Sequence, residues 1–496
     1  MSPRMGTSLL FTSGAILGDV VGAGILTTVV AIANLGWLLG SFTMVGMIMA
    51  NAHISLVLWR VYMHFPEART LSELLDLTFN DASEFKRKVM VQGIGYAQSF
   101  ALYPMLGLLI LTMGKSLGML FHNYHVCLPK WTLLAASLLM PFQTLAGPKL
   151  GSYKGLVYVN CATIVATILL PLGEMVHQGA LVTRGEGTIL AAVSPDLNIG
   201  GVLSSLCSIL FATTGQVIQV EIMGEMRDPS EFPEAYMGLA LPFMMAVFLF
   251  VGLVGYYYRG SAATGMLLDN MPFGTPFRIA SALLFFHMGV TYLIKGTIGC
   301  RALYKRRLHW LSESSAGVGG GLPAARGSEP KAIFRSISGN FPPPERATWG
   351  AVVGGVLVAG VVNSQMVPFF SDLVDLLGAT FLPLVCWVAP IAMYAQLGEC
   401  HRQGNSRIAT LVENALLTSY VVLAAVVMTF GTTTTLMRVH SNWHTYGGPF
   451  ACHCEAMWST CSCSAYHPGM EACAASPGLS LVANASAIFD FAEKPW

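Results

Sequence analysis

Two short segments of the sequence combine glycine with small or polar residues inside apolar stretches, and both could bind a small charged solute. The first is Gly22-Ala23-Gly24, and the second is 211–215, which reads Phe-Ala-Thr-Thr-Gly. Such residues favour an unwound backbone, whose freed amide groups bind anions and whose freed carbonyl oxygens bind cations or ammonium groups. A zwitterionic amino acid requires both. The alternative is close helix packing, because Gly14, Gly18 and Gly22 recur every four residues.

Ionisable side chains inside the same apolar stretches could carry protons. Asp19 precedes Gly22 by three residues, and a centred acid costs about 2.5–3.5 kcal/mol, so it requires a cavity or a partner. Glu221 follows the second segment by six residues, and His287 lies midway along a later apolar stretch. For each of them, the sequence leaves open a proton-coupling role or a structural hydrogen bond to a neighbouring helix. Tyr103 is either an aromatic gate or a core residue.

The composition places these segments in a membrane. Of 496 residues, 54% are hydrophobic and only 11% are charged, whereas soluble proteins carry about 25% charged residues. The 27 Lys and Arg residues balance 26 Asp and Glu residues, so no basic face is expected and nucleic acid is not a predicted partner. The apolar stretches contain no nucleophile–base pair and no zincin spacing, so an enzyme is not expected. The chain is predicted to be a polytopic protein of the lipid bilayer.

Apolar stretches of about 20 residues match the thickness of a bilayer, and they predict eleven transmembrane helices. These lie near residues 8–34, 38–61, 89–116, 131–147, 152–177, 201–225, 235–258, 275–303, 347–366, 370–396 and 408–434. The fourth is the shortest and is closed by Pro148. The predicted transmembrane domain covers 1–434 and includes a cytosolic linker at 304–346 that is rich in Gly, Ser and Pro.

The distribution of basic residues orients the predicted helices. With the N-terminus in the cytosol, the inside connections hold 18 Lys and Arg residues and the outside connections hold 7. The C-terminus is then outside or lumenal, and the plasma membrane and a vacuole-like organelle membrane fit equally. In this topology the first and sixth spans cross the bilayer in opposite directions, and each contains one of the two glycine-containing segments. Interruptions at matching positions of two inverted halves point to a transporter site.

Three motifs, in order along 8–434, resemble the amino acid/auxin permease family, which is defined by an amino acid transporter transmembrane domain. The first is Asp19-Val-Val-Gly-Ala-Gly-Ile-Leu with 31–37, Ala-Ile-Ala-Asn-Leu-Gly-Trp, and it resembles the family's first span. The second, Phe211-Ala-Thr-Thr-Gly-Gln with 225–233, is similar to the sixth span. The third, 367–379 with two later proline pairs, is similar to the ninth-to-tenth junction. Val29 departs from the family, in which proline is common at this position.

The resemblance implies an all-α polytopic membrane protein with a five-plus-five inverted repeat, one further helix, and broken first and sixth helices, which is the LeuT-like architecture of the APC superfamily. It also implies a secondary active transporter of amino acids or related small solutes, a proton-coupled symporter that works by alternating access. The driving gradient of protons or sodium takes the place of a cofactor. The candidate substrate-binding residues are Gly22, Ala23, Gly24, Ile25, Phe211, Ala212, Thr213, Gly215 and Tyr103. The candidate coupling residues are Asp19, Glu221 and His287.

Two other functions stay open at the level of the sequence. One is a permease-like amino-acid receptor or sensor, which would bind its ligand without net transport. The other is a sodium-coupled carrier of a different small organic solute. The linker 304–346 contains no obvious signalling domain, which favours transport over sensing.

The segment 435–496 is predicted to be an extracellular or lumenal tail containing Cys452-His-Cys454, Cys461-Ser-Cys463 and Cys473. Disulfides form on that side of the membrane, and the glycosylation sequon Asn484-Ala-Ser486 is usable only there. Zinc binding, a disordered tail and a segment introduced by a wrong gene model are the alternatives.

Overall fold

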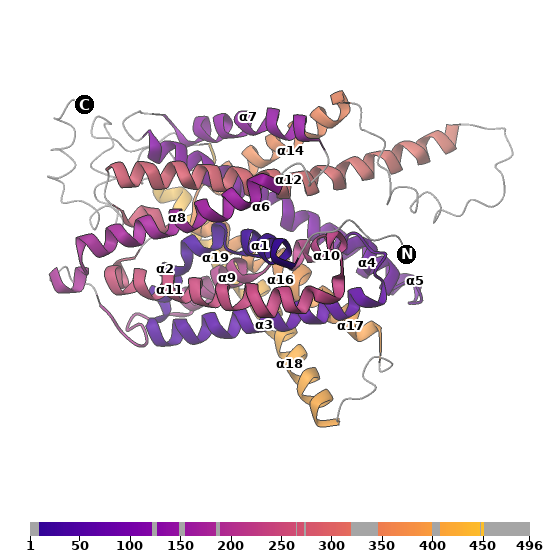
Figure 1. The fold of residues 1–496 in the computed structure, drawn as a ribbon, viewed down its shortest axis with the longest axis horizontal. Coiled ribbons are helices and arrows are strands. Elements are labelled where there is room, and N and C mark those ends of the chain that lie inside the picture. The colour runs from indigo at the N-terminus through magenta and orange to yellow at the C-terminus, as the bar shows by residue number, and fades with distance from the viewer. Residues whose placement is uncertain are drawn as a thin grey trace.

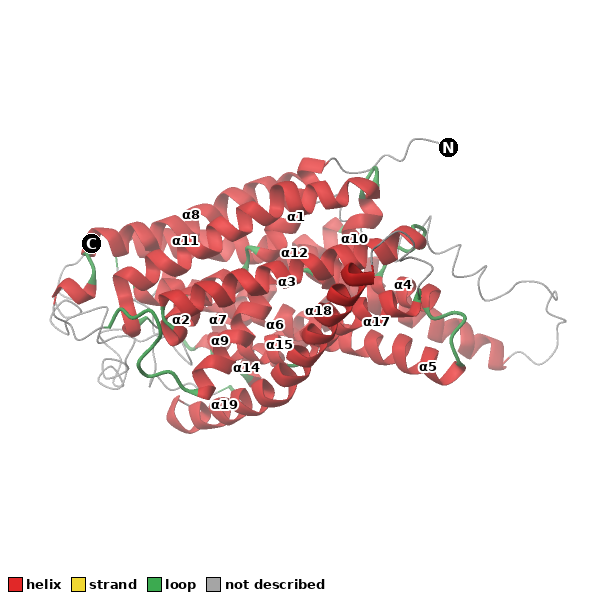
Figure 2. Cartoon of the chain, turned by 90° about the horizontal axis from the view of Figure 1, so that it is seen from below, coloured by secondary structure: helices red, strands yellow, loops and turns green. Residues whose placement is uncertain are grey.

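The computed structural model describes residues 9–121, 126–147, 154–184, 189–263, 265–271, 274–318, 346–398, 407–446 and 448–450. These residues form helices joined by turns. Figures 1 and 2 show most of the helices running roughly parallel to the long axis of the molecule. A bundle of parallel apolar helices satisfies every backbone hydrogen bond inside each helix, which is what a hydrocarbon environment requires.

The first half of the chain provides five spans and two short connecting helices. The spans are α1 (Leu9–Val20) with η1 (Ala23–Thr27) and α2 (Thr28–Leu35), α3 (Trp37–His64), α6 (Ile94–Leu120), α7 (Leu128–Ala146) and α8 (Lys154–Gln178). The connections include α4 (Leu71–Thr78), α5 (Glu84–Lys88), the π-helical turn η2 (Val89–Gly93) and η4 (Leu181–Arg184).

The second half repeats this pattern and adds one span. Its spans are α9 (Ile199–Thr213) with α10 (Gln216–Glu225), η6 (Glu234–Ala240) with α11 (Leu241–Arg259), α12 (Thr275–Val318), α14 (Arg346–Met366), and α15 (Phe370–Ala379) with α16 (Phe381–Pro383), η9 (Leu384–Val388) and α17 (Ala389–Gln396). The added span is α18 (Arg407–Val426), η11 (Val427–Gly431) and α19 (Thr432–Tyr446). Short turns are η5 (Pro229–Glu231), η7 (Gly260–Ala262) and η8 (Leu267–Asn270).

Ten of the eleven predicted spans are long and apolar enough to cross a membrane. Among the described residues, nine helical stretches meet this condition singly, and the bent pair 12–18 and 23–35 makes a tenth, with an angle of 42° at its break. The fourth predicted span, 131–147, is the 19-residue helix α7, which is not among them. Lys130 and Gln143 make α7 less apolar than its neighbours, and it joins the bundle by packing against α6 and α14.

Two helices continue further than the sequence predicted. Helix α12 runs to Val318 and so enters the predicted linker 304–346, and Figure 1 shows it projecting beyond its neighbours. Residues 319–345 lie outside the described part. The last span continues past the predicted end at 434 as far as Tyr446, because two of its later side chains bind α15, as described below. The predicted cysteine-containing and glycosylated part of the tail lies outside the described residues.

Close approaches between helices are made at glycines. Gly107 of α6 lies against the Gly360 carbonyl of α14, which would be 3.3 Å from a Cβ at position 107. A Cβ on Gly378 of α15 would overlap the main chain of Cys207 in α9. Such contacts allow neighbouring backbones to approach closely, which is a principal source of packing energy between helices in lipid. The contact between α15 and α9 ties the tenth span to the sixth.

We expect Gly378→Ala to destabilise the protein by about 1–3 kcal/mol, because the new methyl group would force two backbones apart. Thermal unfolding of purified protein in one detergent measures the effect. Gly355→Ala on α14 is the matched control, because a Cβ at that position meets nothing within 4 Å. Equal melting temperatures for both variants would contradict the close α9–α15 contact.

Candidate functional site

The two interrupted helices meet at their interruptions. A Cβ on Gly24, in η1, would overlap both the main chain and the side chain of Ala212, near the end of α9. Ile25 is fully buried, and Ala23 and Ala212 are nearly so. The structure therefore brings together the two glycine-containing segments that lie almost 190 residues apart in the sequence.

The sixth span is interrupted between Thr213 and Gln216. The Gly215 N–H does not continue the helix but donates to the side-chain Oε1 of Gln216 at 3.1 Å. Among the described main-chain hydrogen bonds, none joins the amides of Gln216 and Val217 to the carbonyl groups of α9. The break thus places the negative end of α9 beside the positive end of α10.

The first span is interrupted in the same way. The Gly22 N–H donates to the Val20 carbonyl at 2.8 Å, which closes the end of α1. No described main-chain hydrogen bond uses the amides of Ala23 and Gly24, and the Gly24 carbonyl accepts a bond from the Thr27 hydroxyl at 2.9 Å. In the described part of the structure, the two breaks therefore offer four amide N–H groups with no main-chain partner, which is a suitable arrangement for a carboxylate.

Three of the remaining predicted substrate-binding residues lie at the second break, and Tyr103 lies against α12. Phe211, Thr213 and Gly215 belong to the α9–α10 interruption, and Phe211 is half-buried. Tyr103 of α6 is also half-buried and donates from its hydroxyl to the Gly299 carbonyl of α12 at 3.4 Å. This contact joins Tyr103 to α12, and its predicted role as a gate stays a prediction.

The three predicted coupling residues lie on three different helices. His287 of α12 is fully buried, and no side chain in the described part of the structure forms a hydrogen bond with its ring. The main chain of Asn160 in α8 interacts with the ring, and the Asn160 Oδ1 makes no hydrogen bond in that part of the structure. Glu221 is half-buried on α10. Asp19 belongs to α1, but its side chain lies outside the described part of the structure.

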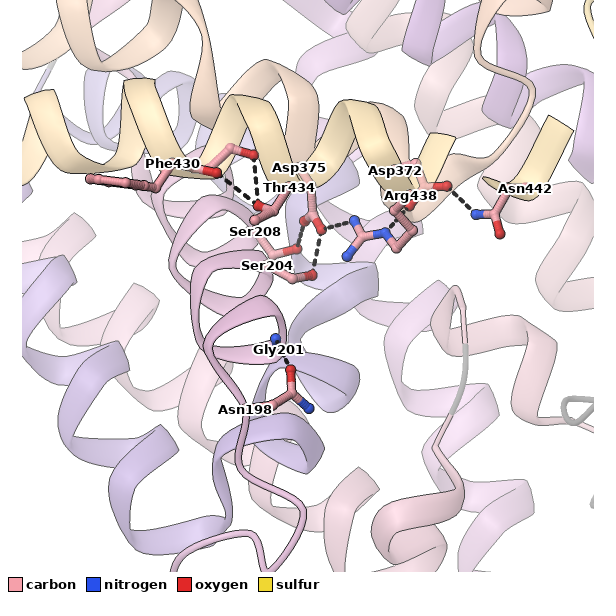
Figure 3. A network of polar contacts seen from close by, with 11 residues as sticks. Asn198, Gly201, Ser204, Ser208, Asp372, Asp375, Phe430, Thr434, Arg438 and Asn442 are labelled. Carbon is pink, nitrogen blue, oxygen red and sulfur yellow. Dashed lines mark hydrogen bonds and ion pairs between the residues drawn. The ribbon is translucent and has the colours of Figure 1, made fainter. Parts of the chain in front are cut away.

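An ionic cluster beside the middle of α9 was not predicted as a unit. Arg438 of α19 forms ion pairs with both Asp372 and Asp375 of α15 (Figure 3). Asp375 is 1% exposed and also accepts hydrogen bonds from the hydroxyl groups of Ser204 and Ser208 of α9. Three spans meet at these carboxylates.

Acidic residues at the start of a helix are commonly helix caps, and Asp372 lies in the first turn of α15. Its partner Asn442, which donates to Asp372 at 2.5 Å, lies 70 residues further along the chain. The missed signal was the pair of polar residues Arg438 and Asn442, one turn apart at the end of the last span.

A second buried ion pair lies outside the predicted site. The Lys115 Nζ in α6 is 3.6 Å from the Asp269 Oδ2 in η8, and 5.8 Å from the centre of the Phe370 ring in α15. Asp269 also accepts the Met266 N–H at 2.8 Å. This ion pair of the buried Lys115 holds η8 against α6.

We expect Arg438→Met to lower the free energy of unfolding by about 3 kcal/mol, because it leaves two buried carboxylates without their cation. The double variant Arg438→Met/Asp375→Asn should recover part of this loss, since one of the uncompensated charges is removed. Melting temperatures in detergent give both values. A double variant no more stable than Arg438→Met would show that the ion pairs are not what holds α19 to α15.

Comparison with known proteins places this geometry in a family. Residues 5–437 match the family model described as transmembrane amino acid transporter protein. Among its relatives in Arabidopsis thaliana, amino acid permease 2 is 24% identical over 422 residues, covering 78% of this chain and 80% of the relative. Amino acid permease 4 is 25% identical over 436 residues, covering 80% of this chain and 87% of the relative.

A solved structure shows the same fold. MhsT in complex with L-phenylalanine superposes with a TM-score of 0.54 at 14% identity, covering 87% of this chain and 99% of that chain. The fold is therefore LeuT-like, with the broken first and sixth helices described above. The family and its relatives are transporters rather than enzymes. Because the family match spans most of the sequence, this multi-pass integral membrane protein belongs to the transmembrane amino acid transporter protein family.

Proposed function

We propose that this protein is a secondary active transporter of amino acids, coupled to protons and working by alternating access. The observation that carries the proposal is the contact between Gly24 and Ala212, which joins two helix breaks from inverted halves of the chain. Two relatives are named amino acid permeases, and the solved structure of MhsT contains L-phenylalanine. These names support an amino acid as the substrate.

The chemistry of the breaks suits a zwitterion. The amides of Ala23, Gly24, Gln216 and Val217 would bind the carboxylate, assisted by the positive end of α10. The carbonyl groups at the end of α9 would bind the ammonium group. A solute with only one charge would leave one set of backbone groups without a partner, and that is costly in a site without water.

His287 is our first choice for the coupling residue. A buried ionisable ring is costly in hydrocarbon, and Lys295 of the same helix also lies near it. Asn160, whose main chain interacts with the ring, belongs to α8, which packs against both α12 and α1. A proton that arrives at His287 would therefore act on a helix that packs against the first span. Asp19 is the second candidate, because it lies on α1 itself.

Alternating access needs contacts that close one end of the site at a time. At the end nearer α4, Arg69 donates to the Gly224 carbonyl of α10, and the Trp59 Nε1 donates to the Pro229 carbonyl at 2.9 Å. At the other end, Asp375 holds α9 through two serine hydroxyls. We propose that the Arg69 contact and the Asp375 contact are the inner and outer closures.

The orientation proposed here has the N-terminus in the cytosol and the C-terminus outside or lumenal. The excess of basic residues in the predicted inside connections supports it. A second support is Cys127, which is disulfide-bonded and lies directly before α7 at the predicted outer face. Disulfides persist in oxidising compartments. The plasma membrane and a vacuole-like organelle membrane both satisfy these conditions.

Uptake of labelled amino acids into proteoliposomes tests the function. We expect at least one of the twenty standard L-amino acids to accumulate when an inward proton gradient is imposed, and to equilibrate without it. Accumulation driven only by sodium would overturn proton coupling and retain the transporter. Saturable binding of an amino acid without any flux would instead establish a receptor.

We expect His287→Gln to abolish proton-driven accumulation while counterflow exchange of the same amino acid continues, because exchange does not require net proton movement. Asp19→Asn, assayed in parallel, tests the second candidate. His177→Gln is the matched control, since His177 lies at the end of α8 with its side chain 85% exposed. Driven accumulation by His287→Gln at the wild-type level would exclude His287 as the coupling residue.

A further inference from the structure

Asn51, near the middle of α3, uses all four hydrogen-bonding positions of its side-chain amide. Its Nδ2 donates to the Thr213 hydroxyl at 2.8 Å and to the Met47 carbonyl at 3.0 Å. Its Oδ1 accepts from the Trp387 Nε1 at 2.8 Å and from the Gln216 Nε2 at 3.2 Å. Asn51 is 1% exposed, so these bonds form without competition from water.

The directions of these bonds are determined by groups that can only donate. The indole N–H of Trp387 is a donor, so it requires the Oδ1 of Asn51. The Gly215 N–H is also a donor, so it requires the Oε1 of Gln216 and turns the Nε2 of Gln216 toward Asn51. No other residue at position 51 reproduces this pattern: leucine makes none of the bonds, and aspartate lacks both donors.

Two of the partners lie on opposite sides of the break in the sixth span. Thr213 is the last residue of α9, and Gln216 is the first residue of α10. One side chain on α3 therefore bridges the break. The third partner, Trp387, belongs to the π-helical turn η9 in the tenth span, and such turns are frequent at functional sites.

We propose that Asn51 is a positioning residue that holds the ends of α9 and α10 in the geometry that binds the substrate. It acts through Thr213 and Gln216, and it joins this geometry to the tenth span through Trp387. The inference rests on the proposed function, because the break is taken to be the substrate site. Replacement of Asn51 by leucine would remove its bonds to Thr213 and Gln216 and weaken substrate binding. Gln216 would keep its bonds to the main-chain carbonyl of residue 51 and to the Ser55 hydroxyl, so the α9 end is loosened more than the α10 end.

Hydrogen–deuterium exchange in nanodiscs tests, without any substrate, whether Asn51 restrains the break in the sixth span. We expect Asn51→Leu to accelerate exchange in residues 209–219 by about tenfold, because two bonds that restrain the break are lost. Gln365→Leu is the matched control. Gln365 is a buried amide that donates to the Thr132 hydroxyl at 3.1 Å and bridges α14 to α7, away from the break.

Equilibrium binding tests whether Asn51 strengthens substrate binding, with each of the twenty labelled L-amino acids as probe. For every amino acid that the wild type binds, we expect Asn51→Leu to raise Kd about tenfold, which corresponds to about 1.4 kcal/mol, and Gln365→Leu to stay within about twofold. Trp387→Phe keeps a ring and removes only the indole donor. It should raise Kd in the wild-type background and have no further effect in Asn51→Leu, because the two residues act through one bond.

The possible failures are distinguishable. If the wild type binds none of the amino acids, the proposed function fails, while the exchange comparison still decides whether Asn51 restrains the break. If the wild type binds, and Asn51→Leu matches Gln365→Leu in exchange or in Kd, the positioning role is overturned. Additive effects of Asn51→Leu and Trp387→Phe would overturn the connection to the tenth span. If Asn51→Leu does not fold, Trp387→Phe alone carries the test, and an unchanged Kd and exchange rate then overturn the proposal.

Discussion

The need to satisfy every backbone polar group without water governs this structure. In hydrocarbon, irregular backbone is tolerated only where protein buries it or where it lines a cavity. The breaks at Gly22 and at 214–215 meet this requirement by lying against each other, with Gly24 on Ala212. Side chains then supply bonds that the helices lack, as Gln216 does for the Gly215 N–H. The groups that still have no main-chain partner are the ones we assign to the substrate.

Much of the fold could be predicted from the sequence, because hydrophobic length is a local property. Ten predicted spans correspond to apolar helical stretches, and only α7 was ambiguous, since Lys130 and Gln143 lower its mean hydropathy. The two breaks could be predicted for the same reason, because glycine acts on its own segment of backbone. The ends of the spans were less certain. The last span continues to Tyr446 because of contacts with α15 that hydropathy does not contain.

The polar contacts that organise the site could not be predicted, because their partners are far apart in the sequence. Asn51 and Trp387 are separated by 336 positions, and Asp375 and Arg438 by 63. A single asparagine in an apolar helix has no pattern that distinguishes a central bridge from an ordinary packing residue. The sequence therefore favoured Asp19, Glu221 and His287, whose side chains are ionisable, over a neutral amide that makes four bonds.

The sixth and tenth spans are joined at two levels, and this limits how the molecule can move. In the middle of α9, Asp375 binds Ser204 and Ser208, and at its end Asn51 connects Thr213 to Trp387. The segment from Ser204 to Thr213 is about 13 Å long, so the two attachments restrain the C-terminal part of α9 against the tenth span. A helix held at two points cannot tilt alone. Opening of the site must therefore either break the ionic cluster first or move α9 and the tenth span together.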